Sequence, residues 1–388
     1  MGALRSPALA QRDAITQPHI FRFFDVDLHV ESDVPAFIAA FDALYARLRI
    51  TASTARRPVC AAAFRSGAPG HPITLTLDGV RYAVAASPRL LPLLVDAVAD
   101  AALARVRSHH LYHGATLAHG DRACLIVGAS GFGKTTLALA LAQRGPRLLS
   151  DEIGAVTASG RVSPFARTVR LRPPTPAILN LPPGTVHAAG HGQLLYASAH
   201  TWAAPAASPK LTHLFILDHA VDDAPLTPGQ SGSRLLLAGA TPALERALHM
   251  TPGVAAVSPR MADAARLTEV VTAGTAPPAT VAAIRRRCAQ ARVLVLGVAP
   301  VATTRPVFAD APQITPVATA TALLATLPHL IGGPAASTRA AAADDASLPA
   351  AALMAELAAA FSTVRCFRVR PGPPGATAAR ILHLMDES

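Results

Sequence analysis

The chain has 388 residues, of which 51% are hydrophobic and only 15% are charged. This composition supports a large core and excludes an intrinsically disordered chain. The formal net charge is +11 and is carried almost entirely by arginine, since Lys134 and Lys210 are the only lysines. The arginines are scattered and form no basic stripe with interleaved aromatic residues. We therefore expect an anionic substrate or partner rather than nucleic acid.

The cysteines and the chain start bear on the cellular compartment. Cys60, Cys124, Cys288 and Cys366 form no C-x-x-C pair, which indicates buried thiols in a reducing cytoplasm and argues against a zinc site. The first residues lack the continuous apolar segment of a secretory signal. The long uncharged stretches contain prolines and threonines, so no membrane span is expected. The expected protein is cytoplasmic and has no membrane partner.

Residues 1–107 are expected to form a small α+β domain. A strand near residues 20–30 precedes the apolar-periodic segment PAFIAAFDALYARL, which is typical of an amphipathic helix. Residues 73–86 alternate in polarity around Asp78-Gly79, which predicts a β-hairpin. A helix from residue 88 to about residue 107 completes this region.

Residues 108–260 are expected to form the core. Two strands, over residues 115–119 and 123–127, are joined by a Gly-Asp turn, and a glycine-rich loop follows the second strand. A helix over residues 134–143 ends at an Arg-Gly-Pro stop, and a strand is predicted over residues 148–156.

The rest of the core is expected to include a surface flap at residues 173–209, which contain no Asp, Glu, Lys or Arg. The flap carries histidines and large aromatic residues, namely His187, His191, Tyr196, His200 and Trp202. Because phosphoryl transfer needs water to be excluded, we expect this flap to cover the acceptor side of the site. A strand over residues 211–217 follows it.

Residues 261–388 are expected to form an Ala-rich α/β region with a low-complexity linker at residues 333–349. A weak internal repeat is suggested by two segments that read as helix, loop, helix and strand. The first opens at Thr241-Pro242 and the second at Thr315-Pro316, although chance similarity in an Ala-rich chain is an alternative.

A phosphate-binding motif lies at residues 128–135, where Gly-Ala-Ser-Gly-Phe-Gly-Lys-Thr satisfies the pattern G-x-x-x-x-G-K-[ST]. Its glycines let backbone N–H groups turn inward around phosphate oxygens, and the helix that follows adds its positive N-terminal end. We therefore expect ATP with Mg²⁺ to bind here. The expected contacts are Gly128, Ser130, Gly131, Phe132, Gly133, Lys134, Thr135 and Thr136.

Individual side chains of this region have expected roles. Lys134 is expected to reach the β- and γ-phosphates and Thr135 to ligate Mg²⁺. The adjacent acids Asp151-Glu152 are candidates for metal binding and general-base catalysis, the alternative being a solvated strand end. His113 would approach the γ-phosphate if its strand runs beside the strand of the loop, and otherwise it is a structural histidine.

Together these residues resemble the catalytic domain of bacterial HPr kinase/phosphorylase. In that family a His-Gly pair precedes a G-x-S-G-x-G-K-S loop, and an R-G-[HP]-x-L-[VIL]-x-D-D segment follows the helix. The matching segments here are His113-Gly114, residues 128–135 and residues 144–152, in the same order. The resemblance implies an α/β fold with a P-loop kinase core of the HPr kinase/phosphoenolpyruvate carboxykinase-like type, beside a small α+β N-terminal domain.

The same resemblance implies functional roles. Asp151 would activate a serine hydroxyl as the base, Glu152 would assist with metal, and His113 would sit beside the reacting phosphate. The sequence departs from the family at Ala129, which replaces a common aspartate, and at Glu152, which replaces the second aspartate. No downstream arginine signature of phosphorolysis is found, so that activity stays open.

A further similarity is to diverged HPr-kinase-related proteins, some of which accompany peptide-modification clusters. In such relatives a segment like residues 164–173 follows the paired acids. Here it carries Arg167, Arg170 and Arg172, which are expected to meet phosphate or an acidic acceptor. A solvated strand face is the alternative.

The sequence thus predicts an ATP- and Mg²⁺-dependent kinase that transfers the γ-phosphoryl group to a hydroxyl, expected to be serine of a peptide or protein. Two alternatives stay open, namely a small-molecule kinase and a non-catalytic nucleotide-binding regulatory module. A homo-oligomer is one possible state, and the choice between ATP and GTP is not decided.

Overall fold

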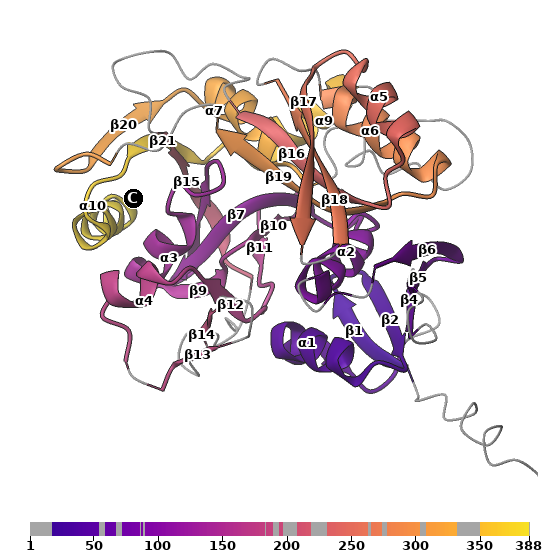
Figure 1. Ribbon diagram of the computed structural model, residues 1–388. Helices are drawn as coiled ribbons and strands as arrows, with labels where there is room; N and C mark the ends of the chain where they lie inside the picture. Colours follow the sequence, from indigo (N-terminus) through magenta and orange to yellow (C-terminus); the bar gives the residue numbers. More distant parts are fainter. Residues whose placement is uncertain are drawn as a thin grey trace, which may run out of the picture.

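The protein is a mixed α/β structure built around several β-sheets (Figure 1), as seen in a computed structural model. The residues described are 18–53, 59–66, 72–85, 87, 90–182, 184–188, 194–196, 208–218, 231–262, 265–273, 278–302, 308–331 and 350–387. No helix within these residues is long and apolar enough to cross a membrane.

The N-terminal part forms a six-stranded sheet in the order β3-β1-β2-β4-β5-β6, in which only β2 and β4 pair in parallel. Its elements are β1 (His19–Phe23), β2 (Val26–Ser32), α1 (Pro35–Tyr45), η2 (Ala46–Leu48), β3 (Arg49–Ile50), β4 (Val59–Arg65), β5 (Ile73–Leu77), β6 (Val80–Val84) and α2 (Leu91–Leu103). The predicted hairpin is confirmed as β5–β6. Asp78 and Gly79 both have positive φ, at 49° and 82°, as a tight two-residue turn requires.

The central sheet follows the order β11-β10-β7-β8-β15-β21-β20, and β9 also pairs with β7. Its strands are β7 (His110–His119), β8 (Arg122–Val127), β9 (Arg147–Ser150), β10 (Ile153–Val156), β11 (Val162–Ser163), β15 (Lys210–Leu217), β20 (Gln313–Val317) and β21 (Arg365–Arg370). Strands β8, β15 and β21 are parallel, and the other pairs are antiparallel.

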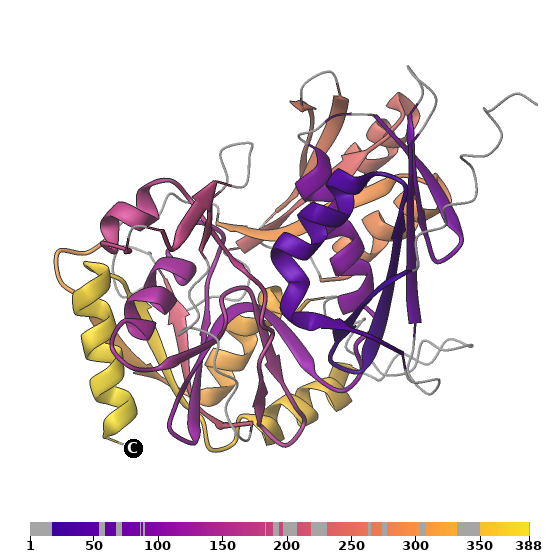
Figure 2. The ribbon, with the colours of Figure 1, turned by 90° about the horizontal axis from the view of Figure 1, so that it is seen from below.

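Helices cover both faces of the central sheet. On one face α3 (Lys134–Ala142) lies alongside α10 (Pro374–Asp386), as Figures 1 and 2 both show, and Leu141 and Ile381 belong to one buried cluster. On the other face α7 (Thr319–Thr326), η4 (Leu327–His329) and α9 (Ala350–Ala360) pack onto a second cluster. The C-terminal residues therefore complete the core that holds the glycine-rich loop.

The single strand predicted over residues 148–156 is wrong, because the structure splits it into β9 and β10. The Ser150 hydroxyl accepts hydrogen bonds from the backbone N–H groups of Glu152 and Ile153, at 3.3 and 2.9 Å. A side-chain oxygen that accepts from the backbone a few residues ahead closes a local turn. The break places the acidic pair in a turn rather than at the end of a strand.

The described part of the expected flap at residues 173–209 contains regular structure. It holds α4 (Pro174–Ile178), β13 (Val186–Ala188) and β14 (Leu194–Tyr196), and both strands join β12 (Val169–Leu171) in a three-stranded sheet. His191, His200 and Trp202 lie outside the described residues.

A separate four-stranded antiparallel sheet, in the order β17-β18-β16-β19, forms much of the remaining chain. Its elements are β16 (Ser231–Ala238), α5 (Pro242–His249), β17 (Val254–Ala262), β18 (Ala265–Thr272), α6 (Pro278–Gln290) and β19 (Leu294–Ala302). The suggested repeat is wrong, because a β-hairpin lies between α5 and α6 and Thr315-Pro316 lies within strand β20. The β-branched residues at the end of β18 favour a strand over a helix.

The expected domain division stays a prediction. One hydrophobic cluster contains Phe21 of β1 and Phe41 of α1 together with Phe165 of the core and Leu296 of β19. The expected boundary between residues 260 and 261 lies within β17. The expected linker at residues 333–349 lies outside the described residues.

Candidate active site

The glycine-rich loop connects the buried strand β8 to helix α3, and its glycines are required for different reasons. Gly131 and Gly133 have φ values of +89° and +88°, which other residues adopt only with strain. Gly128 has an ordinary backbone, but a Cβ there would lie 2.9 Å from the Cβ of Leu217 on β15. The loop is therefore pressed against the neighbouring parallel strand before it turns outward.

Lys134 is held inside this loop. Its side chain is only 7% exposed, and Nζ donates hydrogen bonds to the carbonyl oxygens of Gly128 at 2.8 Å and Ala129 at 3.1 Å. Burial is the main cause that lowers the pKa of Lys134 to about 8; Glu152 and Asp151 oppose this shift, and Arg172 adds to it. An ammonium has three donors, so a third N–H remains for a phosphate oxygen.

The start of α3 suits an anion. Its N-cap is Gly133, and no side chain caps the helix, so the first backbone N–H groups are directed toward the loop without a side-chain partner. Thr135 and Thr136, both half-buried, follow in the first turn. Phe132 is engaged within the loop, since its N–H donates to the Ala129 carbonyl and its ring is buried.

Strand β7 lies between the glycine-rich loop and the turn that contains Asp151 and Glu152, which we call the acidic turn. On one edge its Gly114 is opposite Val127, the last residue of β8, and on the other edge His113 is opposite Ile153 of β10. The Gly114 N–H also donates to the Glu152 carbonyl at 2.9 Å. Two inter-strand spacings of about 4.8 Å place the acidic turn roughly 10 Å from the start of the loop.

Gly114 permits this close arrangement. A Cβ at this position would lie 2.7 Å from the carbonyl oxygen of Ile126, which is a backbone atom and cannot rotate away. The glycine of the predicted His-Gly pair therefore allows the strand of the loop and the strand of the histidine to pack closely.

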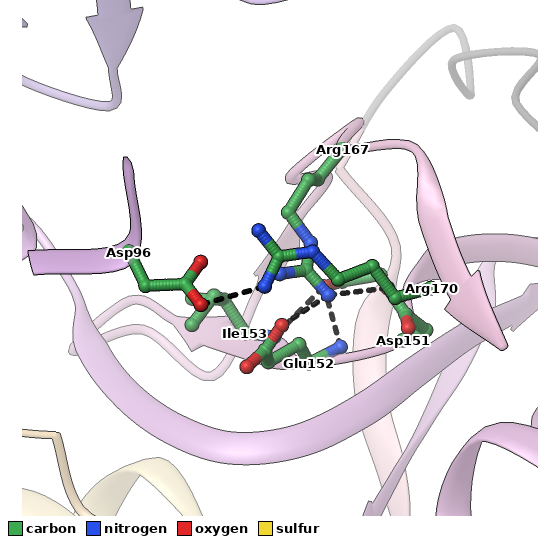
Figure 3. A network of polar contacts seen from close by, with 7 residues as sticks. Asp96, Asp151, Glu152, Ile153, Arg167 and Arg170 are labelled. Atoms are coloured by element: carbon green, nitrogen blue, oxygen red, sulfur yellow. Dashed lines mark hydrogen bonds and ion pairs between the residues drawn. The ribbon is translucent and has the colours of Figure 1, made fainter. Parts of the chain in front are cut away.

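The acidic turn is balanced by an arginine. Nη2 of Arg167 forms an ion pair with Glu152 and lies 3.6 Å from Oδ1 of Asp151 (Figure 3). Arg167 and Asp151 are each only 4% exposed. Burial raises the pKa of Asp151 to about 6 against the opposing effect of Arg167. Burial would also raise the pKa of Glu152, but Arg167 and the other nearby cations lower it.

One oxygen of this pair has no hydrogen bond. Among the described residues, Oδ1 of Asp151 is buried and finds no hydrogen-bond donor within bonding geometry. A buried oxygen without a donor fits a metal ion or a hydroxyl proton as its partner. A raised pKa near neutrality is also what a general base needs.

The predicted arginines are divided between different partners. Arg167 contacts the acidic turn, whereas Nη1 of Arg170 donates to Asp96 of α2 at 2.6 Å (Figure 3). Arg172 is the arginine next to the loop, since its Nη1 lies 3.6 Å from where a Cβ on Gly131 would be. Contact of Arg167 or Arg170 with phosphate therefore stays a prediction.

His113 lies beside the loop, as the predicted strand arrangement requires. It is half-buried, and burial together with Lys134 lowers its pKa to about 4. The ring is therefore neutral near pH 7 and carries one N–H donor and one acceptor nitrogen.

Two residues near the loop, Asp218 and His329, were not predicted from the sequence. Asp218 directly follows β15, which pairs in parallel with β8, and it receives an ion pair from Arg368 at 2.7 Å. An aspartate ending an apolar strand is a weak signal that was available. No sequence pattern indicates His329, in η4, because only the fold brings it close to β7.

The residues expected to bind Mg²⁺ can be compared with the number and type of ligands that this ion prefers in proteins. Within the described residues, no three or more His, Cys, Asp or Glu side chains gather as a metal cage. Mg²⁺ bound with a nucleotide needs only one or two carboxylates besides phosphates and water. By donor type, the Thr135 hydroxyl and the buried Asp151 oxygen without a hydrogen-bond donor fit that requirement, whereas Glu152 already forms an ion pair with Arg167.

Comparison with protein-family models and with curated proteins found no match for this chain.

Proposed function

We propose that this chain is an ATP- and Mg²⁺-dependent phosphotransferase with a P-loop kinase core of the HPr kinase type. It transfers the γ-phosphoryl group to a hydroxyl, serine of a peptide or protein. The observation that carries the proposal is the position of β7, with the glycine-rich loop along one edge and the acidic turn along the other. A triphosphate held by the loop would extend toward the acids.

The loop residues would bind the phosphates. Lys134 and the N-terminal amides of α3 would neutralise charge on the β- and γ-phosphates. Mg²⁺, when bound by Thr135 and the acidic pair, would supply further charge neutralisation on the phosphate oxygens. These groups act by positioning and electrostatics, which account for most of the catalysis of phosphoryl transfer.

Asp151 would act as the base. The acceptor oxygen would form a bond to the γ-phosphorus as the bond to the β,γ-bridging oxygen breaks and ADP leaves. The hydroxyl proton would pass to the buried oxygen of Asp151, which has no hydrogen-bond donor among the described residues. Arg167 would keep this carboxylate ionised close to neutral pH, because it opposes the effect of burial on the Asp151 pKa.

The test is transfer of label from ATP carrying a labelled γ-phosphate. Serine-containing polypeptides, including lysate and the products of neighbouring genes, serve as one set of acceptors, and free sugars and amino acids serve as the other. The expected result is labelled polypeptide with the wild-type chain and none with Lys134→Ala.

The other outcomes of this test contradict the proposal in different ways. Label only on small molecules would favour a small-molecule kinase. Tight ATP binding without label on any acceptor, and unchanged biological function in Asp151→Asn, would favour a regulatory module.

A further inference from the structure

The edge of β7 beside the glycine-rich loop is shared by two segments. Strand β8 pairs with β7 as far as Val127, opposite Gly114, and the loop then turns outward. Beyond that point the same edge of β7 pairs with residues 330–331 from the C-terminal part of the chain. Leu330 forms an antiparallel bridge with Tyr112, and the Ile331 N–H donates to the Leu111 carbonyl at 2.8 Å.

This pairing brings a second histidine to the loop. His329 is the last residue of η4 and directly precedes Leu330, so the bridge between Leu330 and Tyr112 brings it near His113, the residue after Tyr112. Burial, together with the nearby Lys134 and His113, lowers the pKa of His329 to about 3, so the ring lies within electrostatic reach of both residues.

The His329 ring also has unused hydrogen-bonding capacity. The residue is 5% exposed, and its Nδ1 is buried without a hydrogen-bond partner among the described residues. Buried polar atoms in proteins nearly always have a partner, so an exception calls for an explanation. A neutral imidazole has one N–H donor, and its tautomer follows the partner it meets.

We propose that His329 is a phosphate-contacting residue, which forms with His113 and Lys134 one wall of the loop site and donates a ring N–H to the terminal phosphate of bound ATP. This inference rests on the proposed function, because it assumes a triphosphate in the loop. If His329 binds phosphate, the C-terminal region contributes to ATP binding, because η4 supplies a histidine that lies outside the segment around the glycine-rich loop.

The first test compares the affinities for ATP and ADP in His329→Ala and His329→Asn. Loss of one hydrogen bond to a charged group weakens binding by about 10-fold to 100-fold. We expect this loss for ATP in His329→Ala, a much smaller loss for ADP, and partial recovery in His329→Asn, whose amide keeps a donor. The matched control is His119→Ala, at the far end of β7, whose side chain is partly exposed and paired with Asp386.

The second test uses the unmodified protein and does not depend on how a variant folds. With ¹⁵N-labelled histidine, the ring nitrogens of His329 are followed by NMR as a non-hydrolysable ATP analogue is added with Mg²⁺. We expect the signal of the donating nitrogen to shift on adding the analogue, whereas that of His119 stays in place.

The outcomes separate this inference from the proposed function. Equal affinity for ATP in wild type and His329→Ala, or equal losses for ATP and ADP, would overturn the role of His329. An unmoved His329 signal at saturating analogue would do the same. If the wild-type chain binds no ATP, both the inference and the proposed function fail. If ATP binding depends on Lys134 but not on His329, only the inference fails.

Discussion

Removal of the Arg167 guanidinium tests the electrostatics of the acidic turn. Arg167→Gln would leave the carboxylates of Asp151 and Glu152 side by side without their shared cation. Asp151 and Arg167 are both 4% exposed, so water cannot replace the lost ion pair fully. Breaking a buried pair by removing one partner typically costs about 3–5 kcal/mol of unfolding free energy. Because the Glu152 side chain is 35% exposed and water can partly solvate it, we expect a loss at the lower end of this range near pH 7.5.

The loss should depend on pH with a defined sign. Arg167 now lowers the pKa of Asp151, which burial raises to about 6, so its removal would raise that pKa further. A carboxyl group with a raised folded-state pKa stabilises the fold at low pH, and this contribution is lost as pH rises through that pKa. The deficit of Arg167→Gln should therefore be smaller at pH 5 than at pH 7.5.

Urea unfolding followed by circular dichroism measures both effects. The double variant Arg167→Gln/Glu152→Gln should recover part of the loss, because it removes one of the two repelling charges. Arg49→Gln is the control, since its ion pair with Asp42 is at the surface and should change stability by about 0.5 kcal/mol or less. A loss below about 1 kcal/mol in Arg167→Gln at pH 7.5 would show that Arg167 is not needed to neutralise Asp151 and Glu152.

Three further predictions concern catalysis, packing and pH. Asp151→Asn should keep ATP affinity but slow phosphoryl transfer by at least about 100-fold, and near-normal turnover would remove its role as base. Gly114→Ala should destabilise the fold by about 1–3 kcal/mol, because its Cβ would lie 2.7 Å from the Ile126 carbonyl oxygen; a thermal melt matching wild type would contradict this. Burial and Arg365 lower the pKa of His213 to about 4. The neutral His213 ring therefore contributes stability at pH values above the ordinary histidine pKa of about 6.5, and this contribution is lost as pH falls from about 6.5 toward 4. Unfolding free energy should therefore fall by up to about 2 kcal/mol for this histidine between pH 7 and pH 5, and His213→Gln should reduce that fall; an unchanged pH dependence would argue against it.

Local sequence signals were sufficient for several parts of the structure. The hairpin at Asp78-Gly79 depends on two residues that accept positive φ, and it formed as predicted. The helix after the glycine-rich loop also begins where the motif indicated, at Lys134. These features depend on a few neighbouring residues, so a single sequence contains the necessary information.

Other parts depended on contacts that a linear pattern does not contain. The apolar run around Leu149 and Ile153 reads as one strand, and only the Ser150 hydrogen bonds reveal the turn. The position of His329 follows from pairing between segments distant in the sequence. The sequence indicated Arg170 as a candidate but not its partner, because Asp96 lies on α2, in the N-terminal part of the chain.

Titration of the chain with Mg²⁺ and ATP tests whether the glycine-rich loop binds a triphosphate through Lys134, and the chain provides its own control. It has only two lysines: Lys134 is buried in the loop, and Lys210 is exposed at the start of β15. We predict saturable ATP binding by the wild-type chain and by Lys210→Ala, and loss of that binding in Lys134→Ala. Equal affinity in both variants, or no binding by the wild-type chain, would contradict the account.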